Sequence, residues 1–400
     1  MPKLLQIDSC LGILSTGRIT EGIAAIAHKQ GWECHIAHGA RYVGKSNMIS
    51  HQIGSKLTEY LHYAESLLLD KHGLASKRAT RKLIQIIENE IKPDIIHLHC
   101  VHGYYLNYKI LFDYLNTTKI PVVWTFHDCW AFTGHCAHFA PINCSKWQQG
   151  CYDCDLKKDY PSSLLDNSTK NYQLKKELFL QNQNLQIVVV SNWLESIVKQ
   201  SFFKGNKISV INNGIDLTRF KPYPKETKEK IILGVASAWS KDKGLYDFYK
   251  LRELLPIDTY IIKLVGLTED QIRDLPEGIV GISRTSSIEE LARIYSNAFV
   301  FVNTSYADSF PTVNIESIAC GTPVITYKTG GSPEIIDERT GYVVECGDIM
   351  GVVKAIEKMN FDNLSVEDCR NRALSFFDKD DKFSEYVHLY DEIMYERNNG

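Results

Sequence analysis

The fold is decided by one segment, which reads Asp308-Ser309-Phe310-Pro311-Thr312-Val313-Asn314-Ile315-Glu316 and soon continues as Ala319-Cys320-Gly321-Thr322-Pro323-Val324-Ile325. Its apolar spacing predicts a helix after a proline-containing loop, and the Gly-Thr-Pro turn predicts a buried strand after that helix. The unpaired N–H groups of the first helical turn and the helix dipole favour an anion near Phe310 to Val313. Glu316, one turn inside the helix, can accept hydrogen bonds from a vicinal diol such as ribose. The segment therefore predicts a site for a nucleotide diphosphate.

Length and composition limit the class of protein. A chain of 400 residues is too long for one ordinary core and predicts two domains of roughly 150–220 residues. Its 44% apolar and 23% charged residues are typical of a globular protein, and its net charge of −3 argues against a nucleic-acid binder. Met1 to Ile7 reads as a first strand, not as a signal peptide, and no apolar run reaches the roughly 20 residues of a membrane span. We therefore expect a cytoplasmic protein whose eleven cysteines are reduced or bound to metal.

Short β-rich runs alternate with helical patterns, which predicts parallel sheets covered by helices on both faces. The expected strands are Leu4–Asp8, Glu33–His38, Ile95–His99, Val122–His127, Gln186–Ser191, Ile208–Asn212, Ile231–Ala236, Tyr260–Val265, Ile279–Ile282, Ala298–Asn303, Val324–Tyr327 and Gly341–Val344. The charged, proline-containing run Phe220 to Lys228 is the expected linker, and the amphipathic run Phe383 to Tyr395 the expected last helix. The prediction is an α/β protein with two doubly wound, Rossmann-like domains facing across a cleft, with ligands at the carboxyl ends of the strands.

Several motifs resemble glycosyltransferase family 4, whose members have the GT-B fold. These are the spaced carboxylates Asp308 and Glu316 and the motifs Asn213-Gly214-Ile215-Asp216, Gly321-Thr322-Pro323-Val324 and Gly330-Gly331-Ser332-Pro333-Glu334. Closer to the N-terminus, Trp124-Thr125-Phe126-His127-Asp128-Cys129-Trp130-Ala131-Phe132-Thr133-Gly134-His135-Cys136 resembles bacterial exopolysaccharide and capsule glycosyltransferases, including the colanic-acid type. The resemblance covers nearly the whole chain.

The resemblance implies an enzyme that transfers a sugar with retention from a nucleotide-sugar and needs no catalytic metal. A UDP-sugar is the favoured donor over a GDP-sugar. The implied acceptor is a glycan or a polyprenyl-diphosphate-linked oligosaccharide in bacterial surface polysaccharide synthesis. Residues 1–220 would form the acceptor-side domain and residues 221–382 the donor domain, with residues 383–400 as a helix that packs back on the first domain.

The family's paired glutamates, spaced E-x7-E, stand here as Asp308 and Glu316, so the spacing is kept and one side chain is a methylene shorter. The resemblance implies that Glu316 holds the donor ribose and that Asp308 lies near hydroxyls of the transferred sugar. The alternative is a solvent-facing loop aspartate and a glutamate favoured by the helix dipole.

Negative charge develops on the β-phosphate as the glycosidic bond breaks, so a cation is expected there. Lys243 is that cation, and a solvated lysine at a helix start is the alternative. Ala238 stands where the family commonly has arginine, so Lys241 or backbone amides of the 309–312 loop would share the role. The remaining expected donor contacts are Ser309, Phe310, Pro311 and Thr312, together with Arg284 in the loop that contacts the base in the family.

The first domain offers a loop and three histidines. The loop residues Gly12, Thr16, Gly17 and Arg18 follow the first strand, where a glycine turn can approach phosphate and Arg18 can bind an acceptor phosphate. An ordinary βα connection is the alternative. The resemblance places His127, at a strand end, beside the donor sugar. His99 and His102 are further candidates, and strand-end histidines that merely cap polar groups are the alternative for all three.

Five of the eleven cysteines fall within 26 residues: Cys129, Cys136, Cys144, Cys151 and Cys154. The last two have zinc-knuckle spacing, and Cys136 with Cys144 would complete a tetrahedral thiolate site, with His135 as a substitute ligand. We expect a structural zinc in this insertion, at about residues 129–154. The alternatives are reduced cysteines packed as small apolar groups and, less expected in the cytoplasm, disulfides.

Basic and apolar residues after the cysteines predict peripheral contact with the inner face of the plasma membrane. They are Lys157, Lys158, Lys170, Lys175 and Lys176, interleaved with Tyr160, Leu164, Leu165, Tyr172 and Leu174. The alternative is a solvated face, because four acidic residues lie among them.

Two other functions fit the same motifs. One is a different GT-B enzyme, such as a non-hydrolysing nucleotide-sugar epimerase. The other is a non-catalytic protein that binds nucleotide-sugars. The presence of Lys243, Glu316 and His127 argues against the second.

Overall fold

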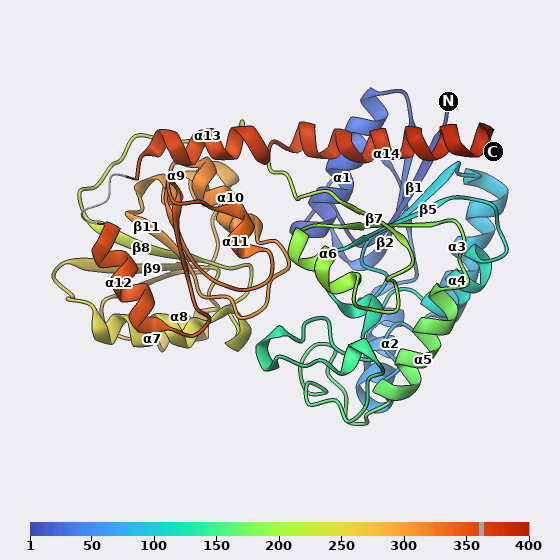
Figure 1. The fold of residues 1–400 in the computed structure, drawn as a ribbon, viewed down its shortest axis with the longest axis horizontal. Coiled ribbons are helices and arrows are strands. Elements are labelled where there is room, and N and C mark those ends of the chain that lie inside the picture. The colour runs from blue at the N-terminus through green and yellow to red at the C-terminus, as the bar shows by residue number, and fades with distance from the viewer. Residues whose placement is uncertain (360–363, 400) are drawn as a thin grey trace. The chain divides into compact units, whose positions relative to one another are not determined.

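The computed structural model describes residues 1–359 and 364–399. The chain divides into two compact units, of which unit 1 comprises Met1–Asn212 and Asp380–Gly400 and unit 2 comprises Asn213–Lys379. Each unit has one parallel sheet with helices around it, so the predicted α/β class is confirmed (Figure 1).

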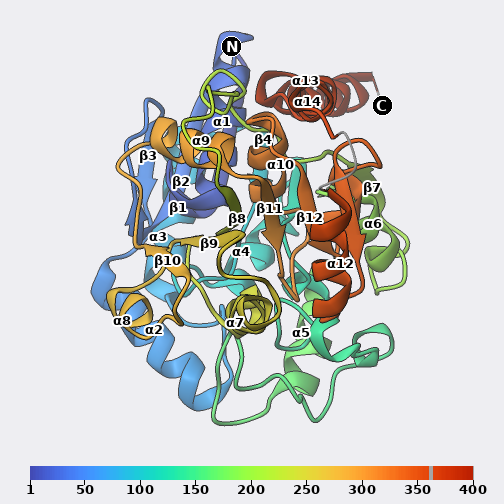
Figure 2. The ribbon, with the colours of Figure 1, turned by 90° about the vertical axis from the view of Figure 1, so that its left-hand side faces the viewer.

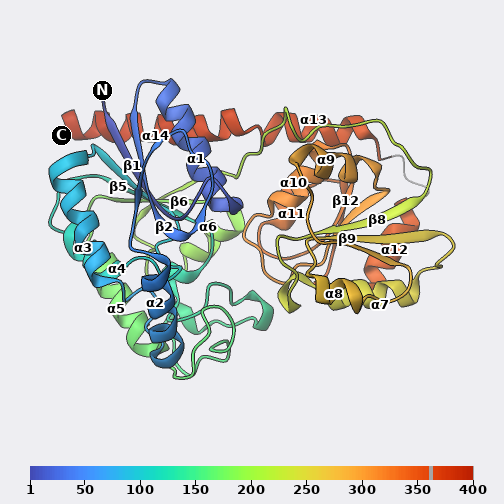
Figure 3. The same ribbon diagram turned by 180° about the vertical axis from the view of Figure 1, so that it is seen from behind.

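Unit 1 is built on a seven-stranded parallel sheet in the order β3-β2-β1-β4-β5-β6-β7. Its strands are β1 Lys3–Leu11, β2 Glu33–Val43, β3 Ile49–Gln52, β4 Ile95–Leu98, β5 Val122–Phe126, β6 Leu185–Val189 and β7 Lys207–Val210. Its helices are α1 Leu14–Lys29, α2 Lys56–Leu69, α3 Lys77–Ile86, α4 Tyr108–Leu115, α5 Ser168–Phe179, α6 Asn192–Val198 and most of α14 Lys379–Asn399. Figure 3 shows α3, α4 and α5 side by side, away from α1 and α14.

Helices α1 and α14 pack against the unit 1 sheet in one apolar cluster. Ile19 and Ile23 of α1 meet Phe383, Tyr386 and Tyr390 of α14 over the strand residues. The apolar spacing of the last helix therefore matches the face that it buries.

Unit 2 has a six-stranded parallel sheet in the order β10-β9-β8-β11-β12-β13. Its strands are β8 Lys230–Val235, β9 Tyr260–Val265, β10 Ile279–Ile282, β11 Val300–Asn303, β12 Val324–Tyr327 and β13 Gly341–Val344. Its helices are α7 Leu245–Leu254, α8 Glu269–Arg273, α9 Ile288–Asn297, α10 Thr312–Ala319, α11 Ser332–Ile335, α12 Ile349–Met359 and α13 Val366–Phe376. Figure 2 shows β10, β9, β8, β11 and β12 following one another across the sheet.

The sequence prediction differs from the structure at two places. Every expected strand is present, but β3 was not expected, because this short edge strand carries polar, mostly exposed residues. The units divide after Asn212, before the expected linker at Phe220 to Lys228. Residues before the linker are bonded within unit 2, since Ile215 donates its N–H to the Phe377 carbonyl at 3.0 Å and Arg370 donates to the Leu217 carbonyl at 2.8 Å.

Each sheet has one point where the strand order reverses. In unit 1 it lies between β1 and β4, and in unit 2 between β8 and β11. In doubly wound sheets ligands bind beyond the carboxyl ends of the strands at such a point. The loops after these four strands are therefore the first places to look for a site.

Candidate active site

The reversal point of unit 2 holds a lysine–aspartate pair. Lys243 ends a 3-10 turn after β8, and Asp308 lies in the loop after β11. The Lys243 Nζ atom is 2.8 Å from Asp308 Oδ2 and 3.4 Å from Ser305 Oγ. Both side chains stay partly exposed, at 37% and 20%. The structure thus brings two of the predicted residues together at a place that a ligand can reach.

Close backbone approaches fix the position of Lys243. Gly244 has a φ of +73°, and a Cβ atom there would lie 2.3 Å from the Thr304 carbonyl oxygen, so no other residue fits without strain. Tyr306 donates its N–H to the Asp242 carbonyl at 2.8 Å. The turn that carries Lys243 is therefore held directly against the end of β11.

A second glycine supports the aspartate. Gly330 has a φ of +53°, and a Cβ atom there would lie 1.7 Å from the Asp308 carbonyl oxygen. The next residue, Gly331, donates its N–H to the Ser309 carbonyl at 3.1 Å. The Gly330-Gly331 motif therefore shapes the backbone of the Asp308 loop.

Helix α10 begins directly after this loop. Pro311 precedes its first turn, and no side chain caps the N–H groups there, which leaves them for solvent or a ligand. The hydroxyl of Ser309 is buried and has no hydrogen-bond partner in the described part of the chain. Inside the helix, Glu316 is buried and its Oε2 atom accepts a hydrogen bond from the Tyr295 hydroxyl at 3.1 Å.

Arg284 lies apart from this group. It is exposed in the loop after β10, an edge strand that β9 separates from β8. Lys241 is also exposed, one residue before Asp242 on the same turn as Lys243. Neither has a salt bridge to Asp308.

Three polar side chains form a chain of hydrogen bonds in unit 1. His127 Nε2 lies 3.1 Å from His99 Nδ1, and His99 Nε2 lies 3.0 Å from Gln6 Oε1. The Gln6 amide N–H in turn donates to the Thr20 carbonyl at 2.9 Å. Gln6 lies in β1, His99 directly follows β4 and His127 directly follows β5. From the sequence, His99 was only a candidate and Gln6 was not predicted.

This network determines which nitrogen of His127 carries a proton. Burial lowers the pKa of His99 well below 6.5 and that of His127 to about 4, so both rings are neutral near pH 7. Because Gln6 Oε1 can only accept, His99 Nε2 donates to it and His99 Nδ1 is left as an acceptor. His127 Nε2 must then donate to His99. The Nδ1 atom of His127 therefore has a lone pair and acts as a hydrogen-bond acceptor.

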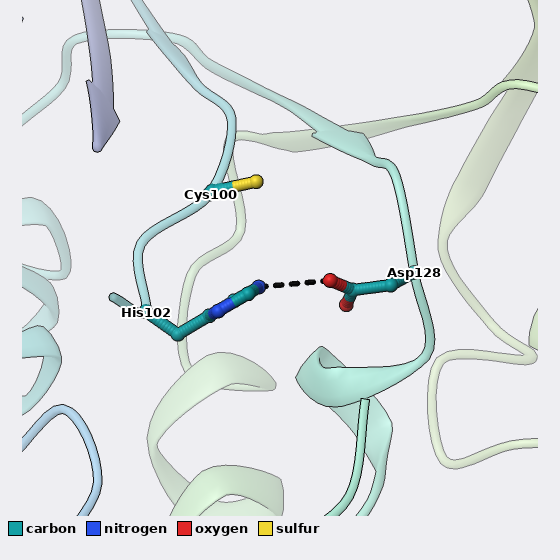
Figure 4. Close-up of side chains that lie close together, drawn as sticks. All are labelled: Cys100, His102 and Asp128. Carbon is teal, nitrogen blue, oxygen red and sulfur yellow. Dashed lines mark hydrogen bonds and ion pairs between the residues drawn. The ribbon is translucent and has the colours of Figure 1, made fainter. Parts of the chain in front are cut away.

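A second group follows the same strands (Figure 4). His102 Nε2 lies 2.9 Å from Asp128 Oδ2, and the other oxygen of Asp128 accepts the Trp130 N–H at 2.9 Å. His102 Nδ1 lies 3.0 Å from the Tyr160 hydroxyl. Burial alone would raise the pKa of Asp128, but the field and hydrogen bond of His102 lower it below its ordinary value. The carboxylate is therefore ionised and oriented.

With Cys100, these two residues form a compact set of ligand-type atoms, all within 4.8 Å of one another. Among the described residues, this set alone meets that criterion; the four cysteines of the predicted zinc site do not. Both ring nitrogens of His102 and both Asp128 oxygens already have protein partners. We therefore interpret the group as a hydrogen-bonded pair beside a thiol.

The predicted loop after β1 is tightly packed. Gly12 has a φ of +62°, and a Cβ atom there would lie 2.4 Å from the Lys45 carbonyl oxygen; at Gly17 it would lie 2.9 Å from Cys10 Cβ. Both glycines are thus needed by the chain itself. Thr16 is half-buried and hydrogen-bonds Asp8, whereas Arg18 is exposed.

Asp8, which is fully buried inside β1, was not predicted as a functional residue. It accepts a hydrogen bond from the Thr20 hydroxyl at 3.2 Å, and burial raises its pKa to about 6. An acidic residue inside an apolar strand was the available signal, since buried carboxylates are rare without partners. Asp8 ties the start of α1 to β1.

Comparison with known proteins decides the family. Residues 18–219 match Glycosyltransferase Family 4, and residues 217–375 match Glycosyl transferases group 1. The chain belongs to glycosyltransferase family 4. It is therefore an enzyme that transfers glycosyl groups, as the motifs predicted.

Two proteins are similar in sequence to this glycosyltransferase over much of its length. The colanic acid biosynthesis glycosyl transferase WcaC of Escherichia coli K12 is 22% identical over 400 residues, which are 93% of this chain and 96% of WcaC. An Escherichia coli UDP-Gal:alpha-D-GlcNAc-diphosphoundecaprenol alpha-1,3-galactosyltransferase is 22% identical over 243 residues, which are 54% of this chain and 63% of that protein.

Solved structures show the fold of the family 4 glycosyltransferase. Sucrose-phosphate synthase from Thermosynechococcus elongatus has a TM-score of 0.74 at 17% identity, with 99% of this chain and 100% of that chain covered. HepE of Anabaena with UDP-glucose has a TM-score of 0.64 at 14% identity, with 98% and 99% covered. At these identities the likeness shows the GT-B fold alone.

The predicted zinc ligands of the glycosyltransferase, Cys136, Cys144, Cys151 and Cys154, all line one small cavity. Beside it Lys175 is fully buried and donates to the Trp130 carbonyl at 2.7 Å. Burial lowers the pKa of this ammonium to about 7. Over residues 1–359 and 364–399, no helix combines the length and apolarity that crossing a membrane requires.

Proposed function

We propose that this glycosyltransferase moves a sugar with retention from a nucleotide-sugar to a glycan or a polyprenyl-diphosphate-linked acceptor in bacterial surface polysaccharide synthesis. A UDP-sugar is the favoured donor, and no catalytic metal takes part. The observation that carries the proposal is the Lys243–Asp308 pair, 2.8 Å apart at the reversal point of unit 2 and directly before helix α10.

The pair is suited to a diphosphate leaving group. An ammonium group has three N–H donors, and Asp308 and Ser305 account for two at Lys243. The third is left for an oxygen of the β-phosphate, whose negative charge grows as the bond to the sugar breaks. The uncapped first turn of α10 and the buried Ser309 hydroxyl supply further donors nearby. Together they take the place of the arginine replaced by Ala238.

Glu316 and His127 suit the two hydroxyl-bearing parts of the donor. The Tyr295 hydroxyl holds the Glu316 carboxylate in place, and this carboxylate would accept hydrogen bonds from the ribose diol. His127 offers Nδ1 as an acceptor, as its bond to His99 requires. Its role is therefore to receive a hydroxyl hydrogen of the transferred sugar, not to donate to the leaving group.

The relatives support the proposed donor and acceptor classes. The Escherichia coli relative is named for UDP-galactose and a diphosphoundecaprenol-linked sugar. WcaC, which aligns over 93% of this chain, is named for colanic acid biosynthesis. Retention is the expected outcome because the family resemblance implies departure of the diphosphate and attack of the acceptor on the same face.

The surface of unit 1 supports contact with a lipid membrane, although at a different place from the one expected. Lys175 and Tyr172 are buried, so the predicted basic run after the cysteines is not a continuous exposed face. Helix α2 instead turns its apolar residues outward: Leu57, Tyr60, Leu61 and Leu68. It buries polar residues in their place: Glu59, His62 and Ser66.

Basic residues lie at the start of the next helix, α3, which contacts the buried side of α2. The start of α3 is next to α2, because His62 Nδ1 of α2 lies 2.9 Å from Ser76 Oγ. The exposed residues of that start are Lys77, Arg78, Arg81 and Lys82. Exposed apolar residues and exposed cationic residues are the two kinds of group that an anionic lipid surface binds. We propose that this face rests on the inner leaflet, where a polyprenyl-linked acceptor would be found.

The test is nucleotide release from a panel of UDP- and GDP-sugars, with membrane lipid extract as the source of acceptor. Wild type should release nucleotide from one donor, and brief EDTA treatment should not change the rate. Glu316→Ala should lose most of this activity, whereas Glu338→Ala, an exposed carboxylate of the same unit, should keep it. Donor binding without turnover by wild type, even with extract, would contradict the proposal and favour a binding protein.

A further inference from the structure

A cavity of about 20 Å³ lies inside the cysteine-rich insertion of unit 1. Four thiols and one imidazole line it: Cys136, Cys144, Cys151, Cys154 and His135. The volume suits one water molecule or one metal ion. Five soft or borderline ligands around so small a space are the donor set that zinc prefers.

His135 is the most unusual of the five. Its Nδ1 atom lies 2.6 Å from Asp70 Oδ1, and both side chains are essentially inaccessible, at 0% and 1%. The carboxylate is itself oriented, because Asp70 Oδ2 accepts the Asn167 N–H at 2.7 Å. Metal-binding histidines characteristically have such a carboxylate on the nitrogen that does not bind the metal.

The other nitrogen of His135 has no partner. Nε2 is buried and makes no hydrogen bond to any described residue. Leaving a buried acceptor unsatisfied costs about 1–3 kcal/mol, so native proteins rarely do so without a reason. A ligand in the adjoining cavity removes that cost.

Hydrogen bonds join three of the thiols to one another or to the backbone at residues 134–136. Cys151 Sγ accepts the Gly134 N–H at 3.1 Å, and Cys136 and Cys154 share a side-chain hydrogen bond. A Cβ atom at position 134 would lie 2.7 Å from Cys151 Cβ, so the two segments meet as closely as glycine allows. Cys144 Sγ makes no hydrogen bond with a described residue.

We propose that this cavity is a structural zinc site, with Cys136 Sγ, Cys151 Sγ, Cys154 Sγ and His135 Nε2 as the four ligands. His135 takes the place of Cys144 in the set expected from sequence. Tetrahedral coordination at about 2.3 Å from sulfur places ligand sulfurs about 3.8 Å apart, so the thiols draw together on binding. The ion joins residues 134–136 to residues 151–154, a region whose only regular structure is short 3-10 turns.

The charges around the cavity agree with a thiolate site. Three thiolates, neutral His135 and Zn²⁺ sum to one negative charge. Lys175 is buried next to it, and Cys151 and Cys136 are the first groups whose charge favours its ammonium form. Asp70 and Asp128 also favour the ammonium form, and a zinc–thiolate group would add a further negative charge near this buried cation.

The site would also support the strand ends of unit 1. The insertion is fastened to them, since Cys129 donates its N–H to the Ala137 carbonyl at 2.8 Å and the Tyr160 hydroxyl meets His102 at 3.0 Å. Loss of the ion should therefore loosen the surroundings of Asp128.

The test is the zinc content of full-length protein purified without chelators, measured by inductively coupled plasma mass spectrometry. Wild type should hold about one zinc per chain. His135→Ala and Cys154→Ser should lose it, and Asp70→Asn should bind it about 10–100-fold more weakly. Cys144→Ser is the matched control, from the same cavity, and should keep the zinc. Loss in Cys144→Ser with retention in His135→Ala would overturn the ligand assignment.

A measurement on wild type covers the case that the cysteine variants do not fold. Cobalt replacing zinc should show the intense visible absorption of a tetrahedral thiolate site. Incubation with 1,10-phenanthroline, but not with its non-chelating 1,7 isomer, should lower the thermal midpoint of unfolding. Wild-type protein that holds no zinc and shows no such absorption after incubation with cobalt would overturn the zinc site itself.

Discussion

The polar side chains that follow the strands differ between the two units. At the reversal point of unit 2 a charged pair, Lys243 and Asp308, stays partly open to solvent. After the strands of unit 1 the imidazoles of the Gln6–His99–His127 chain are neutral near pH 7 and are held by directed hydrogen bonds. This contrast underlies the division of roles that we propose, in which the open cation binds a diphosphate and the half-buried imidazole of His127 binds an uncharged hydroxyl.

The largest effect should come from removing the cation. Lys243→Met should lower kcat by about 10²–10³, the usual cost of losing one donor to a developing negative charge. Stability should change little, because an exposed ion pair is worth about 0–1 kcal/mol. Donor turnover and thermal melting measure the two effects. Lys354→Met, an exposed lysine on α12 of the same unit, is the control; an equal loss there would mean that the ammonium group of Lys243 has no particular role.

Lowering the pH should destabilise unit 1 before unit 2. Burial lowers the pKa of His62 to about 4 from 6.5, and Gly73 donates its N–H to His62 Nε2 at 3.0 Å. As pH falls below 6.5 the unfolded chain takes up a proton that the folded chain refuses until about pH 4. The free energy of unfolding therefore falls over this window, by up to about 3 kcal/mol from this group.

Urea unfolding between pH 7.5 and 4.5 measures this slope. His62→Gln should make it shallower, and the exposed His388→Gln should leave it unchanged. The variant comparison is needed because Asp8, whose pKa is raised to about 6, contributes in the opposite sense. Equal slopes in wild type and His62→Gln would show that His62 is not the cause of the acid sensitivity of unit 1.

The hydrogen-bond chain in unit 1 should have a smaller effect on rate. His99→Leu removes the acceptor for His127 Nε2–H and should lower kcat about tenfold, equivalent to about 1.4 kcal/mol. Nitrogen NMR of the imidazoles reports the cause directly. Wild type should show His127 protonated on Nε2, and His99→Leu should show a mixture. A mixture already present in wild type would contradict the assigned role of His127.

The smallest effect should come from Arg284. It is exposed and apart from the Lys243–Asp308 pair, so Arg284→Ala should change KM for the donor about threefold with kcat unchanged, since exposed contacts contribute under about 1 kcal/mol. Measuring KM with UDP- and GDP-sugars of one sugar shows whether the base is involved. A fall in kcat would place Arg284 nearer the reaction than its position after an edge strand indicates.

Much of the fold and of the donor loop could be predicted because their signals are local. Buried strands such as Val122–Phe126 are runs of mostly apolar residues, and Gly330 has a positive φ that glycine favours. The exposed face of helix α2 could not be predicted from such local signals. Its leucines are exposed because Glu59 accepts the Ala40 N–H at 2.5 Å and His62 accepts that of Gly73, contacts between residues far apart in sequence.

The same limit applies to the candidate sites. Lys243 and Asp308 are 65 positions apart, and their pairing follows from strand order. The partner of His135 is Asp70, again 65 positions away. Spacing within the cysteine segment pointed to Cys144, whereas the contact with Asp70 and the unpaired Nε2 point to His135.

The most direct test of the account is the anomeric configuration of the product. The NMR coupling constant of the new glycosidic linkage should be measured on product made from the donor that the release assay identifies. We predict the same configuration at the anomeric carbon as in the nucleotide-sugar. An inverted linkage would contradict retention and, with it, the same-face departure in which Lys243 stabilises the leaving diphosphate.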